Sequence, residues 1–125
     1  MTAKGDVLVV DDDLAFLTLL STMLTDEGYL VRTADSGEAA LAAIAVKVPE
    51  LVLLDIRMPG LDGFEVYRRL KAKPETSGIL VIFLSAVAET PERVEGFELG
   101  AVDFLSKTFH RGELLARVRI HIELY

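Results

Sequence analysis

The chain has 125 residues, carries a formal net charge of −7 and contains no cysteine. That length suits one domain, which at this size buries about two-thirds of the surface of its unfolded chain. Without thiols, disulfides, thiolate zinc sites and cysteine nucleophiles are excluded. The acidic balance argues against duplex DNA or an anionic membrane as the main partner, since both attract positive surfaces. No apolar run approaches the ~20 residues of a membrane span and no signal peptide is evident, so we expect a cytoplasmic domain.

Apolar runs alternate with amphipathic stretches from the start of the chain. The first run, Val7–Val10, is short and β-branched, which predicts a strand buried on both faces. The stretch Leu14–Glu27 has apolar residues at helical spacing and ends before Gly28, a residue type that often terminates helices. A weaker strand, Tyr29–Ala34, and an alanine-rich helix, Gly37–Val46, follow.

The same alternation continues through the second half of the chain. Leu51–Leu54 and Ile79–Leu84 are apolar runs that predict two more buried strands. Between them a helix is expected to begin at Asp62, with Glu65 three residues on in a capping-box pattern. The remaining predicted elements are a helix that begins at Thr90-Pro91-Glu92 and ends before Gly100, a weaker strand Ala101–Leu105, and a helix Gly112–Leu124.

Five strand–helix units in a row predict an α/β fold, in which helices cover both faces of a parallel sheet. At this length the natural arrangement is the flavodoxin-like (βα)5 sandwich, whose five-stranded parallel sheet has the order 2-1-3-4-5. Ligands of such sheets bind beyond the carboxyl ends of the strands. The residues that directly follow each apolar run are therefore the candidates for a functional site.

Charged and hydroxyl residues follow four of the predicted strands. Asp11 and Asp12 come after the first strand and Asp55 after the third, while Ser85 and Lys107 follow the fourth and fifth. Three carboxylates at one edge of a sheet repel one another, and a hard divalent cation relieves that repulsion. Oxygen ligands without thiolates favour Mg²⁺ or Mn²⁺ over zinc. A metal, a lysine and a hydroxyl around a carboxylate indicate phosphoryl transfer, with the carboxylate as nucleophile.

Four short motifs stand in order along the chain: Val9-Val10-Asp11-Asp12, Asp55-Ile56-Arg57-Met58-Pro59-Gly60, Ser85-Ala86 and Lys107. This ordered set resembles the receiver domain of two-component response regulators, the CheY-like family, from about residue 7 to residue 124. The resemblance implies a phospho-acceptor signalling domain of a phosphorelay. It implies no enzyme activity beyond the domain's own phosphorylation and dephosphorylation.

The resemblance also implies a role for each matched residue. Asp55 would be the phospho-acceptor. Asp12 and Asp55 would bind Mg²⁺ directly, together with the main-chain carbonyl of Arg57, and Asp11 would bind it through a water molecule. The residues expected to bind the phosphoryl group and to switch are Ser85, Ala86, Lys107 and Phe104.

The partners follow from the same resemblance. The family accepts its phosphoryl group from a phosphohistidine on a sensor histidine kinase or a phosphotransfer protein. It reports the change through the face formed by the fourth helix, fifth strand and fifth helix, where we expect a phosphorylation-dependent homodimer. Asp103 and His121 are interpreted as solvated surface groups, and we expect no direct binding of nucleic acid or membrane. The candidate partner contacts on that face are Arg93, Glu98, Asp103, Arg117 and Arg119.

The chain departs from the family pattern after Lys107, where Thr108 stands in place of the usual proline. A cis bond before a non-proline residue costs about 2.5–4 kcal/mol, so we expect a trans Lys107–Thr108 bond and a rebuilt loop. Phe104 lacks the hydroxyl of a tyrosine, so any switch at that position acts by packing alone. The helical pattern still runs at Tyr125, which favours a single receiver domain, residues 1–125, excised from a longer regulator.

Other functions compete with the receiver assignment. A nucleotide or flavin domain needs a glycine- or hydroxyl-rich turn after the first strand, and this chain has three carboxylates there. An aspartyl-phosphate phosphatase of the haloacid dehalogenase class carries a second Asp two residues after its nucleophile, where this chain has Arg57. A degenerate receiver that acts as a phosphorylation-independent interaction module remains the third alternative.

Overall fold

Five parallel strands form one sheet in the order β2-β1-β3-β4-β5, as the sequence predicts. The computed structural model describes residues 4–86 and 103–124. The predicted strand boundaries hold to within one or two residues wherever the chain is described. The strands are β1 (Asp6–Val10), β2 (Leu30–Ala34), β3 (Leu51–Asp55), β4 (Leu80–Ser85) and β5 (Asp103–Ser106).

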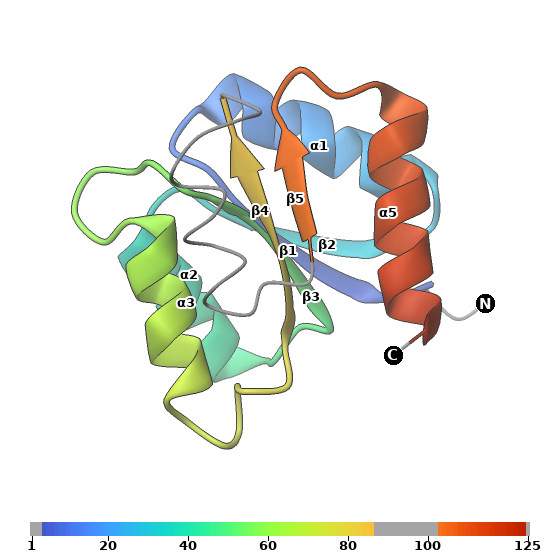
Figure 1. Ribbon diagram of the computed structural model, residues 1–125. Helices are drawn as coiled ribbons and strands as arrows, with labels where there is room; N and C mark the ends of the chain where they lie inside the picture. The colour runs from blue at the N-terminus through green and yellow to red at the C-terminus, as the bar shows by residue number, and fades with distance from the viewer. Residues whose placement is uncertain (1–3, 87–102, 125) are drawn as a thin grey trace.

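Helices cover both faces of this sheet, with α1 and α5 on one side and α2 and α3 on the other (Figure 1). The predicted helix between Thr90 and Gly100 lies outside the described residues, as do Arg93 and Glu98. Of the helices that are described, none is long and apolar enough to cross a membrane. Their bounds are α1 (Leu14–Asp26), α2 (Gly37–Val46), α3 (Gly63–Lys71) and α5 (Arg111–Leu124).

The central strands are apolar except at their end residues, because each of them contributes to two cores. In β1, Val7 and Val9 pack against α1 and α5, while Leu8 and Val10 pack against α2 and α3. Successive side chains of a strand point to opposite faces, so a strand between two helical layers has no polar face. The edge strand β2 keeps exposed positions, which explains its weaker pattern in the sequence.

Side-chain caps fix where three helices begin. Asp13 Oδ1 accepts hydrogen bonds from the Ala15 and Phe16 N–H groups, at 3.0 and 3.3 Å. Ser36 caps α2 and Asp62 caps α3 in the same way, and the sequence predicts the cap at Asp62. Each cap satisfies N–H groups that have no partner within the helix. The three helices that follow β1, β2 and β3 therefore start at defined positions beyond the strand ends.

The interpretation of Asp103 and His121 as solvated surface groups is wrong. Asp103 is only 8% exposed, and its two oxygens accept hydrogen bonds from Arg117 Nη1 at 2.8 and 2.7 Å. His121 Nε2 lies 3.0 Å from Asp103 Oδ2. Burial alone would raise the pKa of Asp103, but the bonds from His121 and Arg117 outweigh it and lower that pKa. Asp103 is thus buried and paired within the chain, whereas Arg117 is paired with it but 40% exposed, so its role as a partner contact stays a prediction.

Gly63 allows α3 to begin directly against the end of β3. A Cβ atom at this position would overlap the Asp55 carbonyl oxygen and lie 2.9 Å from the Ile56 Cα. The Gly63 N–H donates a 2.8 Å hydrogen bond to the Ile56 carbonyl, which holds the close approach. The strand end that carries Asp55 therefore depends on the absence of a side chain at residue 63.

We predict that Gly63→Ala lowers the free energy of unfolding by about 1–3 kcal/mol, because the added methyl group forces backbone atoms apart. Urea unfolding measures this change. The matched control is Gly78→Ala, since a Cβ at Gly78 meets nothing within 4 Å. That variant should be neutral or stabilised by about 0.4–1 kcal/mol. Equal stability of the two variants would show that the close approach imposes no constraint.

Candidate metal centre

Three carboxylates meet at the carboxyl edge of the sheet. Asp11 directly follows β1 and Asp55 ends the neighbouring parallel strand β3, where Val10 is in register with Leu54. Asp11, Asp12 and Asp55 each offer one oxygen, and these oxygens all lie within 4.8 Å of one another. The sequence predicted this convergence, because carboxyl ends of adjacent parallel strands meet at one edge.

The three carboxylates differ in their surroundings. Asp11 is fully buried and Asp55 is 3% exposed, whereas Asp12 is exposed. Asp11 Oδ1 accepts a 2.9 Å hydrogen bond from the Asp13 N–H, and Asp55 Oδ1 accepts a 3.3 Å bond from the Arg57 N–H. Two of the acids are thus held by the backbone of the loops that follow them, and the third stands at the rim.

Lys107 brings a positive charge into this cluster. Its Nζ lies 2.8 Å from Asp11 Oδ2 and 3.3 Å from Asp55 Oδ1. Its backbone N–H donates a 2.7 Å hydrogen bond to the Ser85 carbonyl, which ties the end of β5 to the end of β4. Burial lowers the pKa of Lys107, but the two carboxylates outweigh that effect and raise it, so Lys107 is charged. One ammonium group does not balance three carboxylates.

The surroundings of Asp55 raise the pKa of its carboxyl group. Burial and the nearby charge of Asp11 raise the pKa of Asp55 to about 7, although Lys107 opposes the shift. A carboxyl group with a raised pKa holds a proton near neutral pH, and a bound cation replaces that proton. Crowded oxygen donors without sulfur fit a hard divalent cation, as the sequence suggested.

The carboxylates open onto a cleft of about 270 Å³. Asp11 is fully buried and is not among the lining residues. The cleft is lined by Asp12, Asp13, Asp55, Ile56, Arg57, Ser85, Ala86 and Lys107.

Phe104, predicted as a switch residue, is 3% exposed and packs against Phe83 in the core under α2 and α3, with ring centroids 5.4 Å apart.

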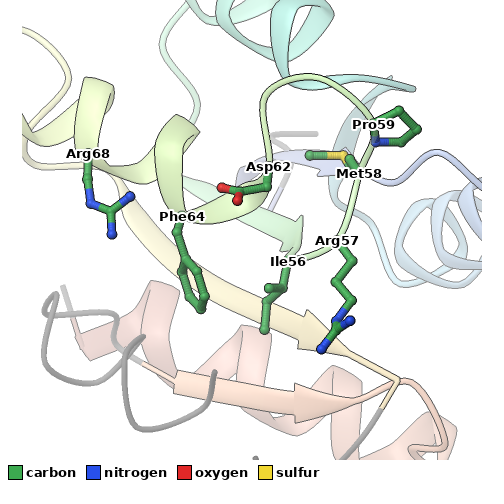
Figure 2. A pocket seen from close by; sticks show the side chains of 7 residues that line it. All are labelled: Ile56, Arg57, Met58, Pro59, Asp62, Phe64 and Arg68. Carbon is green, nitrogen blue, oxygen red and sulfur yellow. The ribbon is translucent and has the colours of Figure 1, made fainter. Parts of the chain in front are cut away.

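A larger hollow of about 630 Å³ is lined by the loop between β3 and α3 and by α3 itself (Figure 2). It shares Ile56 and Arg57 with the acidic cleft. Figure 2 shows the Arg57 and Arg68 side chains on either side of Ile56 and Phe64. Asp11, Asp12 and Asp55 do not line this hollow, so its size does not make it the metal centre.

Two hydroxyl groups form hydrogen bonds within the loop after Lys107. The described residues contain no cis peptide bond, so the expectation of a trans Lys107–Thr108 bond is confirmed. The Thr108 N–H donates to Ser106 Oγ at 3.2 Å, a bond for which proline has no donor. The Thr108 hydroxyl lies 2.7 Å from the same Ser106 oxygen.

Sequence reasoning missed two aromatic residues beside the centre. Lys107 Nζ lies 5.1 Å from the centroid of the Phe16 ring, and the Phe16 and Phe109 rings are 6.0 Å apart. In the sequence, Phe16 is one of several apolar residues at helical spacing in Leu14–Glu27. Nothing in the local pattern distinguishes it from Leu17 or Leu20, which do face the core.

We predict that the unfolding temperature of the metal-free protein falls between pH 5 and pH 8, and that Mg²⁺ reverses the fall. The folded pKa of Asp55 lies above its unfolded value, so its contribution to stability is present at low pH and is lost as pH rises through about 7. Mg²⁺ at tenfold its dissociation constant adds about 1.4 kcal/mol, or roughly 4 °C.

Thermal unfolding at pH 5 and pH 8, at matched ionic strength, measures both effects. Asp55→Asn removes the titrating group and a charged ligand, so its unfolding temperature should depend less on pH and on Mg²⁺. An equal response of wild type and Asp55→Asn to Mg²⁺ at pH 8 would contradict a metal centre at Asp55.

Comparison with known proteins gives a consistent family. The model of the response regulator receiver domain matches residues 7–119. Response regulator PleD of Caulobacter vibrioides is 47% identical over 113 residues, which make up 90% of this chain and 25% of PleD. The DNA-binding response regulator MtrA of Mycobacterium bovis is 39% identical over 121 residues, 97% of this chain and 52% of MtrA. The chain therefore spans a quarter to a half of these relatives.

A solved structure agrees over nearly the full length. The chemotaxis protein CheY4 of Vibrio cholerae superposes with a TM-score of 0.87 at 28% identity, covering 96% of this chain and 98% of CheY4. The sheet order and the acidic edge described above thus occur together with a family match over most of the chain. The chain belongs to the receiver domain family of two-component response regulators.

Proposed function

We propose that this receiver domain takes a phosphoryl group on Asp55 from a phosphohistidine of a sensor histidine kinase or a phosphotransfer protein. One observation carries the proposal. Asp55 both lines the acidic cleft and contacts Lys107, and Ser85 lines the same cleft. The nucleophile, the cation and the hydroxyl that phosphoryl transfer needs therefore share one opening.

The other two carboxylates suit the nucleophile role less well. Both oxygens of Asp11 are engaged, one by the Asp13 N–H and one by Lys107, and Asp11 does not line the cleft. Asp12 is exposed and forms no ion pair with any residue in the described part of the chain. Both contacts that fix Asp55 fall on Oδ1, so Oδ2 is the oxygen that we assign to the attack.

The reaction is an in-line displacement at phosphorus. Asp55 Oδ2 forms the new O–P bond while the P–N bond to the donor imidazole breaks, and the imidazole nitrogen leaves with the electron pair and takes up a proton. Lys107 places its ammonium group beside the developing charge on the phosphoryl oxygens. Mg²⁺ held by Asp12, Asp55 and the Arg57 carbonyl, with Asp11 acting through water, would neutralise further charge on those oxygens.

The response to phosphorylation would pass through Ser85. Its hydroxyl donates to a phosphoryl oxygen, and the small side chain of Ala86 leaves the cleft open. Phe104 packs against Phe83 two residues before Ser85 and, without a hydroxyl, would respond by repacking. The phosphoryl group shifts the population of two conformations only as far as its affinities for them differ.

Two other functions are less well supported. A phosphatase would need an acid two residues after Asp55, and Arg57 cannot supply a proton at neutral pH. We therefore propose no enzyme activity beyond the domain's own phosphorylation and dephosphorylation. A phosphorylation-independent interaction module would have no need for Asp55, Ser85 and Lys107 around one cleft.

Incubation with acetyl phosphate and Mg²⁺ should add one phosphoryl group, measured by intact mass. Asp55→Asn should abolish the adduct, while the matched surface variant Asp26→Asn should keep the wild-type rate. Lys107→Ala should slow the reaction by about a hundredfold, the size expected when one group that stabilises transition-state charge is removed. An adduct that survives Asp55→Asn, or no adduct on the folded wild type, would refute the phospho-acceptor role.

We further propose that phosphorylation promotes a homodimer through α5, β5 and the segment between β4 and β5. On α5, Ile120 and Leu124 are 46% and 73% exposed and lie one helical turn apart, in line with Arg117. Arg117→Glu is a poor probe of this surface, because it would also remove one of the two partners of the buried Asp103.

Ile120→Glu should weaken self-association of the phosphorylated protein by about tenfold or more, as loss of a buried apolar contact does. Leu19→Glu is the matched control, since Leu19 is 50% exposed on α1. Sedimentation velocity of phosphorylated and unphosphorylated protein measures both. Equal association of the two variants would remove α5 from the interface.

A further inference from the structure

We propose that Phe16 is a positioning residue for Lys107, holding its ammonium group over the aromatic ring and in contact with Asp11 and Asp55. The consequence for reaction rate rests on the proposed function, whereas the placement of Lys107 does not. Phe16 belongs to α1 and Lys107 to the loop after β5, so the contact joins two elements far apart in the sequence.

The geometry at the ammonium group carries the first step. Lys107 Nζ lies 5.1 Å from the Phe16 ring centroid, within the range in which a ring face attracts a cation. The same Nζ lies 2.8 Å from Asp11 Oδ2 and 3.3 Å from Asp55 Oδ1. With the lysine side chain only 23% exposed, the ring replaces water on one side of the charge.

Two contacts hold Phe16, one at its backbone and one at its ring. The Phe16 N–H donates to Asp13 Oδ1 at 3.3 Å, which fixes the first turn of α1 next to the acidic cleft. The Phe109 ring packs against it at a 56° tilt with centroids 6.0 Å apart, a favourable arrangement for an aromatic pair. The Phe16 ring is therefore packed against a second aromatic ring as well as lying near the lysine.

The backbone that carries Lys107 needs such support. A 2.7 Å bond to the Ser85 carbonyl fixes its N–H, and the Thr108 N–H bonds the Ser106 hydroxyl. These bonds fix where the side chain starts but not where its four-carbon stem ends. Lysine has large rotamer freedom and a strongly hydrated charge, so an unguided ammonium group favours solvent. Asp11 and Asp55 hold the ammonium group from one side, and the Phe16 ring adds the apolar contact that confines the far end of the stem.

The experiment compares Phe16→Leu, which removes the ring, with Phe16→Tyr, which keeps it. The first measurement is the NMR chemical shift of the Lys107 ε-methylene group in unphosphorylated protein, assigned with Lys107→Arg. We expect the ring-current displacement of this signal in wild type and Phe16→Tyr, and its loss in Phe16→Leu. Phe16→Met, unbranched and flexible, is a second ring-free variant should Phe16→Leu unfold.

The second measurement is the initial rate of Asp55 phosphorylation at saturating Mg²⁺. Phe16→Leu should be about three- to tenfold slower than wild type, while Phe16→Tyr should stay within about twofold. A general loss of stability does not predict this rescue by tyrosine.

Each outcome decides the inference. An unchanged Lys107 signal in Phe16→Leu overturns it, whether or not the protein is phosphorylated. Loss of the ring-current displacement with an unchanged phosphorylation rate shows that the ring touches the lysine without positioning it for reaction. That result also overturns the inference. If wild type takes no phosphoryl group, the proposed function fails, and the ring-current displacement in wild type still decides whether the Phe16 ring lies against the Lys107 side chain, as the inference requires.

Discussion

The repulsion between carboxylates at the carboxyl edge of the sheet is the constraint to which the rest of the site responds. Asp11 and Asp55 end adjacent strands whose register is fixed by backbone hydrogen bonds and by packing on both faces. They cannot move apart without breaking the sheet. Burial and, after it, the charge of Asp11 raise the pKa of Asp55 to about 7, and Lys107 contacts both acids.

The two helical layers make that constraint rigid. Caps at Asp13 and Asp62 fix the starts of α1 and α3, and Gly63 lets α3 start against the carbonyl of Asp55. A looser connection would let the carboxylates spread and lose their affinity for a cation. The close approach of α3 to β3 at Gly63 and the crowding of the carboxylates are thus linked, because packing of the fold holds the like charges together.

Sequence patterns predicted what depends on local periodicity and on the rule for strand ends. The central strands were found because every residue of Val7–Val10 is buried, and the rule then placed Asp11, Asp55 and Lys107 at one edge. What failed depends on distant pairs. Asp103 meets Arg117 and His121, which lie 14 and 18 residues away. A single aspartate in a sequence gives no sign that a helix will return to bury it.

The two contacts of Lys107 are unequal, and the difference bears on how the site would respond to a phosphoryl group. Asp11 is fully buried and only 2.8 Å from the ammonium group, whereas the contact with Asp55 is longer, at 3.3 Å. Phosphorylation would replace one carboxylate charge by about −1.5 to −2 and place it further into the cleft. Lys107 can swing from Asp55 toward the new oxygens while it keeps Asp11 as its pivot. That movement requires the side chain to stay out of bulk water, and the Phe16 ring, 5.1 Å from the ammonium group, would help to keep it there.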